Sequence, residues 1–556
     1  MDEQLPWRII DKYFKDNPYS FVSHHLDSYN DFFNDGINRI FKEKNPIKIM
    51  KQQDPKTNEF RYRANIYLGG KDGNRLYYGK PVIYDDNREH FMYPNEARLR
   101  NMTYGVTIHY DVDVEFFIME GEDVVPHNIT LDKIFLGRFP IMMMSDLCIL
   151  KNLSPSVRFE MGECRNDRGG YFIIDGKEKC IVSQEKFANN MLYVTDKVND
   201  LYSHAAQIRS VSEDASKPVR TLAIRIVSPT TTLTNNQIVV NIPNVKKPVP
   251  LFILMRALGI ESDKAIIEHC LLDLEKYESY IDLFIPSIHD AGKIFNQDVA
   301  LKYIATFTKG KTLPHALEIL TNYFLPHIGE MNFVDKAYFV GHMVRQLLRV
   351  STKEIKPTDR DSFEYKRVEL PGSLIYDLFK EYFTLQQRNI YLKIDREYYY
   401  KQGIYQKNFI GLIESNYREF FSERIVESGF RRAFKGNWGA EEHTKRQGVV
   451  QDLNRLSFNS ALSHLRKISL PLESSAKVVG PRLLHSSQWG IIDPVDTPDG
   501  GNIGLHKHMA IAAKITSGCS GYPMIRWMRV NANMRLLTEC SPYYVSTMCK
   551  IIINGN

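Results

Sequence analysis

Near its end the chain reads Gly436-Asn437-Trp438-Gly439, Arg446-Gln447-Gly448-Val449-Val450-Gln451, Leu462-Ser463-His464-Leu465-Arg466-Lys467, Pro481-Arg482-Leu483-Leu484-His485, Gln488-Trp489-Gly490 and Asp496-Thr497-Pro498-Asp499-Gly500. From residue 431 to residue 507 there are eleven Lys or Arg residues and seven Asp or Glu residues. Cations interleaved with Gly, Pro and Trp suit a surface where backbone and positive side chains together approach a polyanion. The alternative is an ordinary solvated face.

The residues from Ser457 to Lys467 predict a short helix. Ser457 is a candidate N-cap, and Arg466 and Lys467 fall at the C-terminal end, where the helix dipole favours cations. Ile503, Leu505 and residues 509–512 predict the start of a strand. The segment offers cations and hydrogen-bond donors, and it contains no nucleophile–base pair or carboxylate cluster that we would interpret as catalytic.

Bulk composition limits the classes of protein that fit. At about 150 residues per domain, 556 residues predict three or four domains. The hydrophobic content of 43% and charged content of 25% are ordinary for globular proteins. A net charge of +6 is too small for a protein that coats nucleic acid throughout. Any phosphate binding is therefore local.

Cysteines and apolar runs exclude several further classes. The seven cysteines are scattered and form no C-x-x-C pair, which argues against zinc and against a disulfide framework and favours a reducing compartment. The acidic N-terminus, Met1-Asp2-Glu3-Gln4, does not resemble a secretory signal. The most apolar run, residues 139–150, is too short to span a membrane and is interrupted by polar residues.

The first half of the chain predicts helices, then strands. Apolar residues between Ile10 and Phe41 recur at helical spacing, whereas residues 62–68 and 106–117 predict strands. Asp175-Gly176 between two apolar runs predicts a hairpin, because both positions tolerate positive φ. Polar side chains decorate this hairpin, and both a solvated edge and phosphate contact remain open for them: Lys177, Lys179, Gln184 and Lys186.

Arg98 and Arg100, in a polar turn, are interpreted as salt-bridging residues. Farther on, residues 221–227 and 237–242 predict strands. Helices are predicted at residues 251–258, 264–272, 299–308, 315–323, 336–350 and 373–392. Together these elements predict an α+β multidomain protein.

At this point the chain resembles a known family. It is similar to the N-terminal part of the second-largest, β-type subunit of multisubunit DNA-directed RNA polymerase. The eukaryotic, archaeal and large-DNA-virus type is closer than the bacterial type. The late motifs quoted above carry the resemblance from about residue 90 onward, together with Glu96-Ala97-Arg98-Leu99-Arg100-Asn101, Gly169 to Lys179, Arg256-Ala257-Leu258-Gly259 and Asp359-Arg360-Asp361.

The resemblance implies a domain plan. Residues 1–202 would form the first part of the protrusion and residues 203–384 the lobe. Residues 385–430 would be the return segment of the protrusion, residues 431–505 the fork, and residues 506–556 the start of an external domain.

The resemblance also implies site residues. The positions expected to contact nucleic acid or shape the active-centre cleft are Arg446, Gln451, Arg466, Lys467, Lys477, Arg482 and Asp499. Asp499 stands where the family usually has Glu, which shortens the side chain by one methylene. His464 and Ser469 correspond to the rifamycin-pocket segment of bacterial relatives, and no drug sensitivity follows from that.

The implied function is template-directed transcription by a complex, with this chain forming one side of the cleft for DNA and the RNA–DNA hybrid. No catalytic residue and no metal ligand, zinc included, is assigned to this chain. The Mg²⁺ of the assembled enzyme would be bound mainly by aspartates of the partner largest subunit. The expected partners are that subunit, other polymerase subunits, template DNA and nascent RNA, and no membrane. An isolated chain is expected to be inactive.

The resemblance predicts further sequence beyond Asn556, so we expect a missing C-terminal half of the subunit to be another partner. The alternative is a truncated, non-catalytic nucleic-acid-binding or assembly module. The expected location is inside the cell and not secreted: the nucleus, or the virion or host cytoplasm if the source is a large DNA virus, which abundant Asn, Ile, Lys and Tyr would suit.

Overall fold

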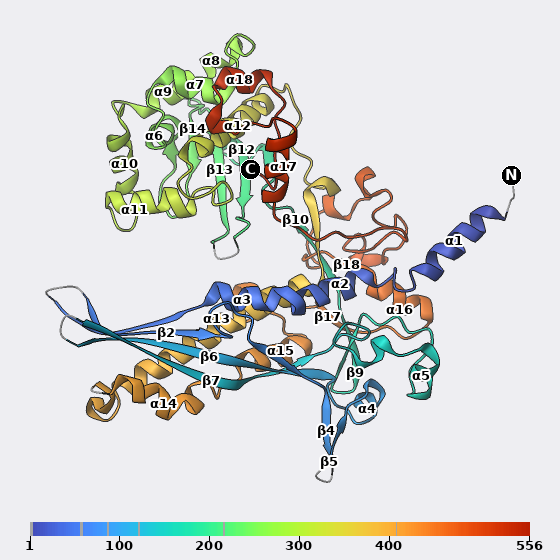
Figure 1. Cartoon of the computed structure of the whole chain (residues 1–556). Coiled ribbons are helices and arrows are strands. Elements are labelled where there is room, and N and C mark those ends of the chain that lie inside the picture. Colours follow the sequence, from blue (N-terminus) through green and yellow to red (C-terminus); the bar gives the residue numbers. More distant parts are fainter. Residues whose placement is uncertain (1–3, 56–58, 86–87, 121–122, 215–216, 407) are drawn as a thin grey trace. The chain divides into compact units, whose positions relative to one another are not determined.

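The computed structural model describes the chain apart from residues 1–3, 56–58, 86–87, 121–122, 215–216 and 407. It divides into two compact units (Figure 1). Unit 1 comprises residues 1–186 and 366–517, and unit 2 comprises residues 187–365 and 518–556. Each unit has its own hydrophobic core and combines helices with sheets. The predicted α+β multidomain class is therefore confirmed.

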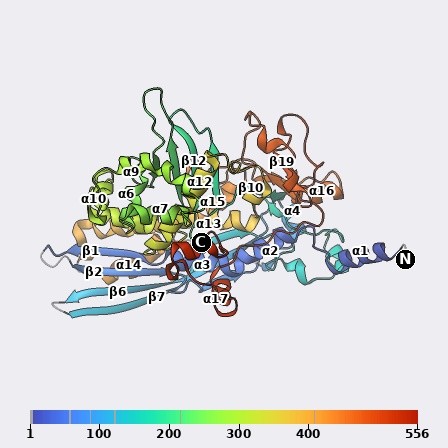
Figure 2. The ribbon, with the colours of Figure 1, turned by 90° about the horizontal axis from the view of Figure 1, so that it is seen from above.

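Unit 1 is built around a five-stranded sheet. Its strands are β1 (Ile47–Gln53), β2 (Phe60–Leu68), β3 (Leu76–Gly79), β6 (Gly105–Glu120) and β7 (Asp123–Pro140). Side chains of β2 alternate between buried and more exposed positions, as expected for a strand with one face on a core. Figure 2 shows the long paired strands β6 and β7 on the side of unit 1 opposite α1 (Leu5–Asp16).

Helices cover this sheet, and the longest is α13 (Pro371–Tyr398), which begins with a proline in its first turn. The neighbouring helices are α2 (Ser23–Asp31), α3 (Ile37–Lys44), α14 (Phe409–Phe420) and α15 (Ile425–Phe434). Aromatic rings fill the interface: Phe383 lies 4.4 Å from Phe41 and 5.8 Å from Phe379, centroid to centroid. The domain boundary expected at residue 384 falls inside this continuous helix.

The remaining strands of unit 1 form smaller sheets that position the late motifs. A three-stranded sheet has the order β17-β9-β8, and a four-stranded sheet has the order β16-β10-β18-β19. The bounds are β8 (Phe172–Ile174), β9 (Lys177–Ile181), β10 (Ser183–Phe187), β16 (Lys366–Glu369), β17 (Val450–Asp452), β18 (Lys467–Ser469) and β19 (His506–His508). Two further strands pair only with each other, β4 (Val82–Asp85) and β5 (Arg88–Phe91), and lead into α4 (Pro94–Leu99).

Two local predictions are confirmed by backbone geometry. Asp175 and Gly176 form the β8–β9 turn with φ values of 48° and 79°. Ser457 caps α16 (Phe458–Leu465), accepting a hydrogen bond from the Ser460 backbone N–H at 3.1 Å. The helix is shorter than predicted, because Lys467 already belongs to β18. The strand predicted to start between Ile503 and residue 512 is present but short: β19 ends at His508, Met509 forms a single β-bridge with Ile492, and residues 510–512 are not in a strand.

Unit 2 packs helices onto an antiparallel sheet whose order is β11-β12-β13-β14-β15. The strands are β11 (Leu192–Asp196), β12 (Tyr202–Ser210), β13 (Arg220–Val227), β14 (Ile238–Asn241) and β15 (Val249–Pro250). The helices that follow are α6 (Leu251–Ala257), α7 (Asp263–Leu271), α8 (Glu278–Ile281), α9 (Ile285–Ala291), α10 (Gln297–Thr306), α11 (Leu313–Glu318) and α12 (Phe333–Ser351). The predicted strands correspond to β13 and β14, and the predicted helices to α6, α7, α10, α11 and α12; β11, β12, β15, α8 and α9 were not predicted.

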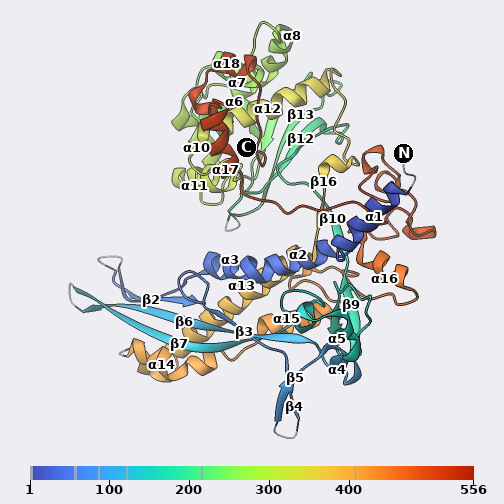
Figure 3. The ribbon, with the colours of Figure 1, turned by 45° about the vertical axis from the view of Figure 1, so that its right-hand side comes forward.

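The C-terminal segment of the chain returns to unit 2. It carries α17 (Tyr522–Asn531) and α18 (Pro542–Thr547), and Figure 3 shows α18 beside α7 and α12. Asn190 Nδ2 donates to the Asn554 carbonyl at 3.0 Å, which ties this segment to the sheet. Among the described residues, no helix combines the length and apolar composition needed to cross a bilayer.

Candidate nucleic-acid interface

Strand pairing within unit 1 brings the late motifs onto the 172–186 hairpin region. Gln451 of β17 pairs with Cys180 of β9, and Ser469 of β18 pairs with Gln184 of β10. Lys467 pairs with His508 on the other side of β18. Residues almost 300 positions apart in sequence therefore lie side by side in neighbouring strands.

Gln451 and His464 form a fixed pair in this region. Nε2 of His464 lies 3.0 Å from Oε1 of Gln451, and the Gln451 amide nitrogen donates to the Gly448 carbonyl at 2.9 Å. Burial, with smaller contributions from Lys467 and His508, lowers the pKa of His464 to about 4. The ring is therefore neutral at neutral pH and acts as a hydrogen-bonding group rather than a cation.

Arg466 lies in the interior. Only 6% of it is exposed, and its guanidinium donates to the carbonyls of Phe21 at 3.0 Å and Ala510 at 2.6 Å. Burial lowers its pKa. These bonds tie the N-terminal helices to the segment after β19, so Arg466 shapes the site by positioning backbone. Its predicted contact with nucleic acid stays a prediction.

Lys467 is the half-buried cation of this region. Burial lowers the pKa of its ammonium group, while Cys180 and Asp496 act in the opposite direction. Within the described part of the chain, it forms no ion pair. A partly desolvated cation without a counter-ion is costly and is suited to accept an anion from outside.

Arg446 and Lys186 share one carboxylate. Arg446 Nη1 lies 3.0 Å from Glu369 Oε2, and Lys186 Nζ lies 3.0 Å from Glu369 Oε1. Burial alone would raise the pKa of Glu369, but Lys186 and Arg446 outweigh it and hold that pKa below its usual value. The Arg446 side chain remains 43% exposed, so it could still face a phosphate.

Arg482 fastens two loops. Its guanidinium donates to the carbonyls of Gly501 at 2.7 Å and Ile503 at 3.1 Å, and on the other side to Ser474 at 2.9 Å and Ala476 at 3.3 Å. Four carbonyl acceptors use most of its donor capacity. In this structure Arg482 therefore holds the loops that carry the neighbouring site residues.

The other predicted positions lie along the same loops. Lys477 and Asp499 are exposed, and Ser469 is buried with its hydroxyl 3.1 Å from Nδ1 of His506. The same part of the chain also carries exposed apolar side chains, including Trp489 at 78%, Val495 at 82% and Leu484 at 62%.

The structure answers part of the question left open for the hairpin. Lys179 pairs with Asp452 at 2.7 Å, Lys186 pairs with Glu369, and Gln184 is buried against the Val182 carbonyl. Lys177 alone of the four is fully exposed. These contacts favour a structural role for Lys179, Lys186 and Gln184.

The prediction that Arg98 and Arg100 are salt-bridging residues is confirmed. Arg98 contacts Glu163 at 2.7 Å and Glu178 at 2.9 Å, and Arg100 contacts Asp85 at 2.5 Å.

One buried ion-pair group escaped the sequence analysis. Glu185 on β10 lies 3.0 Å from Lys366 on β16 and 3.0 Å from Lys507 on β19. All three side chains are at least 92% buried, given exposed fractions of 2%, 6% and 8%. Each comes from a different part of the sequence, and only a sheet that joins these strands reveals them.

Acidic groups near this interface are dispersed. Among the described residues, one group has metal-ligand spacing: Asp85, His90 and Glu96, on the β4–β5 hairpin and α4. Arg100 contacts both of its carboxylates, at 2.5 Å and 3.1 Å, and so offsets part of their negative charge. The site region therefore offers electrostatic binding of phosphates and hydrogen bonding, with positions set by a rigid framework.

Comparison with known proteins places these motifs in a family. A family model described as RNA polymerase beta subunit matches residues 20–411, and one described as RNA polymerase Rpb2, domain 3, matches residues 451–515. The chain is 34% identical to DNA-directed RNA polymerase II subunit RPB2 of Encephalitozoon cuniculi, over 99% of this chain and 47% of that protein. It is 33% identical to DNA-directed RNA polymerase II subunit 2 of Arabidopsis thaliana, over 99% and 46%.

The chain thus spans about half the length of these relatives. A shorter archaeal relative, DNA-directed RNA polymerase subunit Rpo2N of Methanothermobacter thermautotrophicus, is 29% identical over 92% of this chain and 95% of that protein. The first family match includes the hairpin region and α13, and the second includes Gln451, His464, Lys467 and Arg482. The chain belongs to the RNA polymerase beta subunit family.

Proposed function

We propose that this chain works as part of a DNA-directed RNA polymerase, where it forms one side of the cleft that holds DNA and the RNA–DNA hybrid. Relatives of both full length and similar length carry polymerase subunit names. The observation that carries the proposal within this chain is the state of Lys467, which is half-buried and has no ion pair among the described residues.

Lys467 differs from the other cations of the interface in what surrounds it. Arg466 and Arg482 donate hydrogen bonds to backbone carbonyls, and Arg446 forms an ion pair with Glu369. A phosphate beside Lys467 would supply the missing counter-charge, and the exposed Lys477 would add to the local positive potential. Binding of this kind reads the sugar–phosphate backbone and not the base sequence, as transcription of any template requires.

His464 and Gln451 would act beside Lys467 as neutral partners. Their mutual hydrogen bond leaves the region without an additional charge that could repel or trap a sliding backbone. Asp499, exposed on its turn, would face the same cleft.

The domain plan belongs to this proposal. The protrusion (residues 1–202 and 385–430) and the fork (residues 431–505) would lie mostly in unit 1, and the lobe (residues 203–384) mostly in unit 2. Residues 506–556 would begin the external domain.

Partners and metal follow from the same proposal. Two carboxylates of this region contact different partners: Asp452 contacts Lys179, and Asp496 contacts His508. They do not form the cluster of oxygen ligands that Mg²⁺ prefers. The Mg²⁺ of the assembled enzyme would therefore be held mainly by a largest-subunit partner, and other polymerase subunits and the sequence that longer relatives carry would complete the complex.

The test is a reconstituted polymerase containing either the natural chain or Lys467→Met. Association with an RNA–DNA hybrid is measured as a function of salt concentration. Loss of one phosphate contact should reduce the slope of log K against log [salt] by about 0.7–0.9. The matched control is Lys179→Met, whose cation is already paired with Asp452 and should leave the slope unchanged.

Three results would count against the proposal. An unchanged slope in the Lys467→Met enzyme would indicate that Lys467 makes no phosphate contact and has a structural role. Templated RNA synthesis by the isolated chain would show that the catalytic centre is not completed by partners. Hybrid binding without any co-assembly with a largest subunit would favour the alternative of a non-catalytic binding module.

A further inference from the structure

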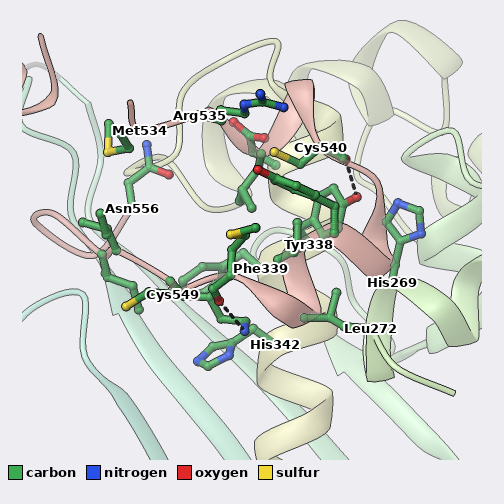
Figure 4. Close-up of a pocket in the computed structure, with 18 of the residues that line it drawn as sticks. His269, Leu272, Tyr338, Phe339, His342, Met534, Arg535, Cys540, Cys549 and Asn556 are labelled. Carbon is green, nitrogen blue, oxygen red and sulfur yellow. Dashed lines mark hydrogen bonds between the residues drawn. The ribbon is translucent and has the colours of Figure 1, made fainter. Parts of the chain in front are cut away.

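Unit 2 contains a cavity of about 450 Å³ that is unrelated to the residues discussed above. It is lined by α7, α12 and the C-terminal segment from Ala532 to Asn556 (Figure 4). This volume falls within the range of cavities that hold small organic ligands. All lining residues belong to unit 2, so the cavity depends on no arrangement between the units.

One part of the cavity wall is apolar and held in place. Leu272 and Tyr338 are buried, and Phe339 projects from the same helix as Tyr338 (Figure 4). The Tyr338 hydroxyl donates to the Cys540 carbonyl at 3.2 Å, and its ring lies 4.6 Å from that of His269. These contacts fix the α12 side of the cavity to the C-terminal segment.

Cations gather at the cavity without counter-ions. Arg345 and Lys550 both line it. Burial lowers the pKa of His342, and these two cations lower it further, to about 4 in total. Arg345 Nη2 contacts His342 Nδ1 at 3.4 Å, and Lys550 Nζ donates to the Met548 carbonyl at 3.4 Å. Neither cation forms an ion pair among the described residues.

Few acidic side chains offset the positive charge of the cavity lining. Asp335 is the one acidic side chain among the lining residues, and it accepts a hydrogen bond from the side-chain amide of Asn332. A third cation, Arg535, lies over the ring of Tyr544, 5.4 Å from its centroid. The lining therefore combines an apolar wall with an excess of positive charge.

We propose that this cavity binds a small amphiphilic organic anion, with its carboxylate or sulfonate at Arg345 and Lys550 and its apolar body against Tyr338 and Phe339. A neutral hydrocarbon would leave the two cations uncompensated. A nucleoside triphosphate would place a polar sugar and several charges against an apolar wall. The anion's single charge and apolar body match both halves of the lining.

The test titrates the full chain with two fluorescent probes that differ in charge. 8-Anilinonaphthalene-1-sulfonate carries a sulfonate, and N-phenyl-1-naphthylamine has the same ring system without it. We expect saturable binding of one sulfonate per chain, and affinity reduced about tenfold or more in Arg345→Met, because a charge-assisted hydrogen bond is lost. Binding of the neutral probe should change less than about twofold.

Further variants keep the result interpretable. Lys550→Met removes an exposed cation and should weaken sulfonate binding even if Arg345→Met folds poorly, which circular dichroism would reveal. Lys302→Met, an exposed lysine of α10 outside the lining, is the matched control and should have no effect. Met548→Trp should fill the cavity and weaken both probes.

The proposal fails if each probe binds Met548→Trp as tightly as it binds the natural chain, since the binding site would then lie outside the cavity. It also fails if Arg345→Met and Lys550→Met both retain the natural affinity for the sulfonate, or if no saturable sulfonate binding occurs.

Discussion

Nε2 of His464 lies 3.0 Å from Oε1 of Gln451, and this contact fixes the tautomer of the ring. Nδ1 of His464 accepts from the backbone N–H of Asn454 at 3.1 Å, so the ring proton is on Nε2 and is donated to Gln451. Protonating the ring would break the bond to Asn454. Cys180, Lys467 and His508 also face this ring, and none of them would stabilise an added positive charge.

The first prediction is a pH dependence of stability. The pKa of His464 is lowered from 6.5 to about 4. Between these two pH values the ring binds a proton in the unfolded chain but not in the folded chain. Stability is therefore complete above pH 6.5 and falls as the pH drops toward 4, by at most about 1.4 kcal/mol per pH unit. Urea unfolding of His464→Gln between pH 7 and pH 4.5 should show a shallower decline than the natural chain.

His443→Gln is the matched control for this experiment, because the His443 side chain is 76% exposed and takes no part in the contact between His464 and Gln451. Parallel profiles for the natural chain and His464→Gln would show that the ring accepts its proton in the folded state.

The second prediction concerns the buried ion-pair group. Glu185 joins Lys366 of β16 and Lys507 of β19 through β10. Removing the carboxylate in Glu185→Gln leaves two cations buried in one sheet, which should lower the free energy of unfolding by about 3–5 kcal/mol. Denaturant unfolding measures it. A loss below about 1 kcal/mol would mean that water reaches these cations.

These residues show how far the sequence could predict the site. The Asp175-Gly176 turn and the Ser457 cap were predictable, because the residues that signal each feature lie within four positions of one another in the sequence. The ion-pair group of Glu185 was not, because strand pairing alone brings its members together.

Arg466 illustrates the second limit. The resemblance predicts that Arg466 contacts nucleic acid or shapes the cleft, and in the structure its guanidinium donates to the Phe21 carbonyl, 445 positions away in the sequence. Charge in a sequence indicates a potential role, and burial decides whether the charge can meet solvent. The return of residues 518–556 to unit 2 is subject to the same limit, because it depends on packing against residues far away in the sequence.

The third prediction compares two glycines with the same backbone angle. Gly176 and Gly490 both have φ of 79°. A Cβ at Gly176 would lie 2.7 Å from Asn101 Oδ1 and 2.8 Å from Asn101 Cα, whereas at Gly490 nothing lies within 4 Å. Both substitutions to Ala strain the backbone, by about 1 kcal/mol each, but Gly176→Ala should cost about 1–2 kcal/mol more. Thermal unfolding of both variants checks the difference, and equal losses would show that the Asn101 loop moves aside freely.

The fourth prediction tests whether Arg482 holds its loops by geometry or by charge. Its planar guanidinium reaches the Ser474 carbonyl at 2.9 Å and the Gly501 carbonyl at 2.7 Å, on two separate loops. Lysine keeps the charge but cannot donate in two directions from a rigid fork. Arg482→Lys should therefore increase amide hydrogen exchange across residues 472–479 and 500–504, with global stability reduced by about 1–2 kcal/mol. Lys477→Met, which removes an exposed cation from the same loop, is the control and should leave exchange unchanged. If Arg482→Lys exchanged like the natural chain and Arg482→Met did not, positive charge alone would account for the ordering of both loops.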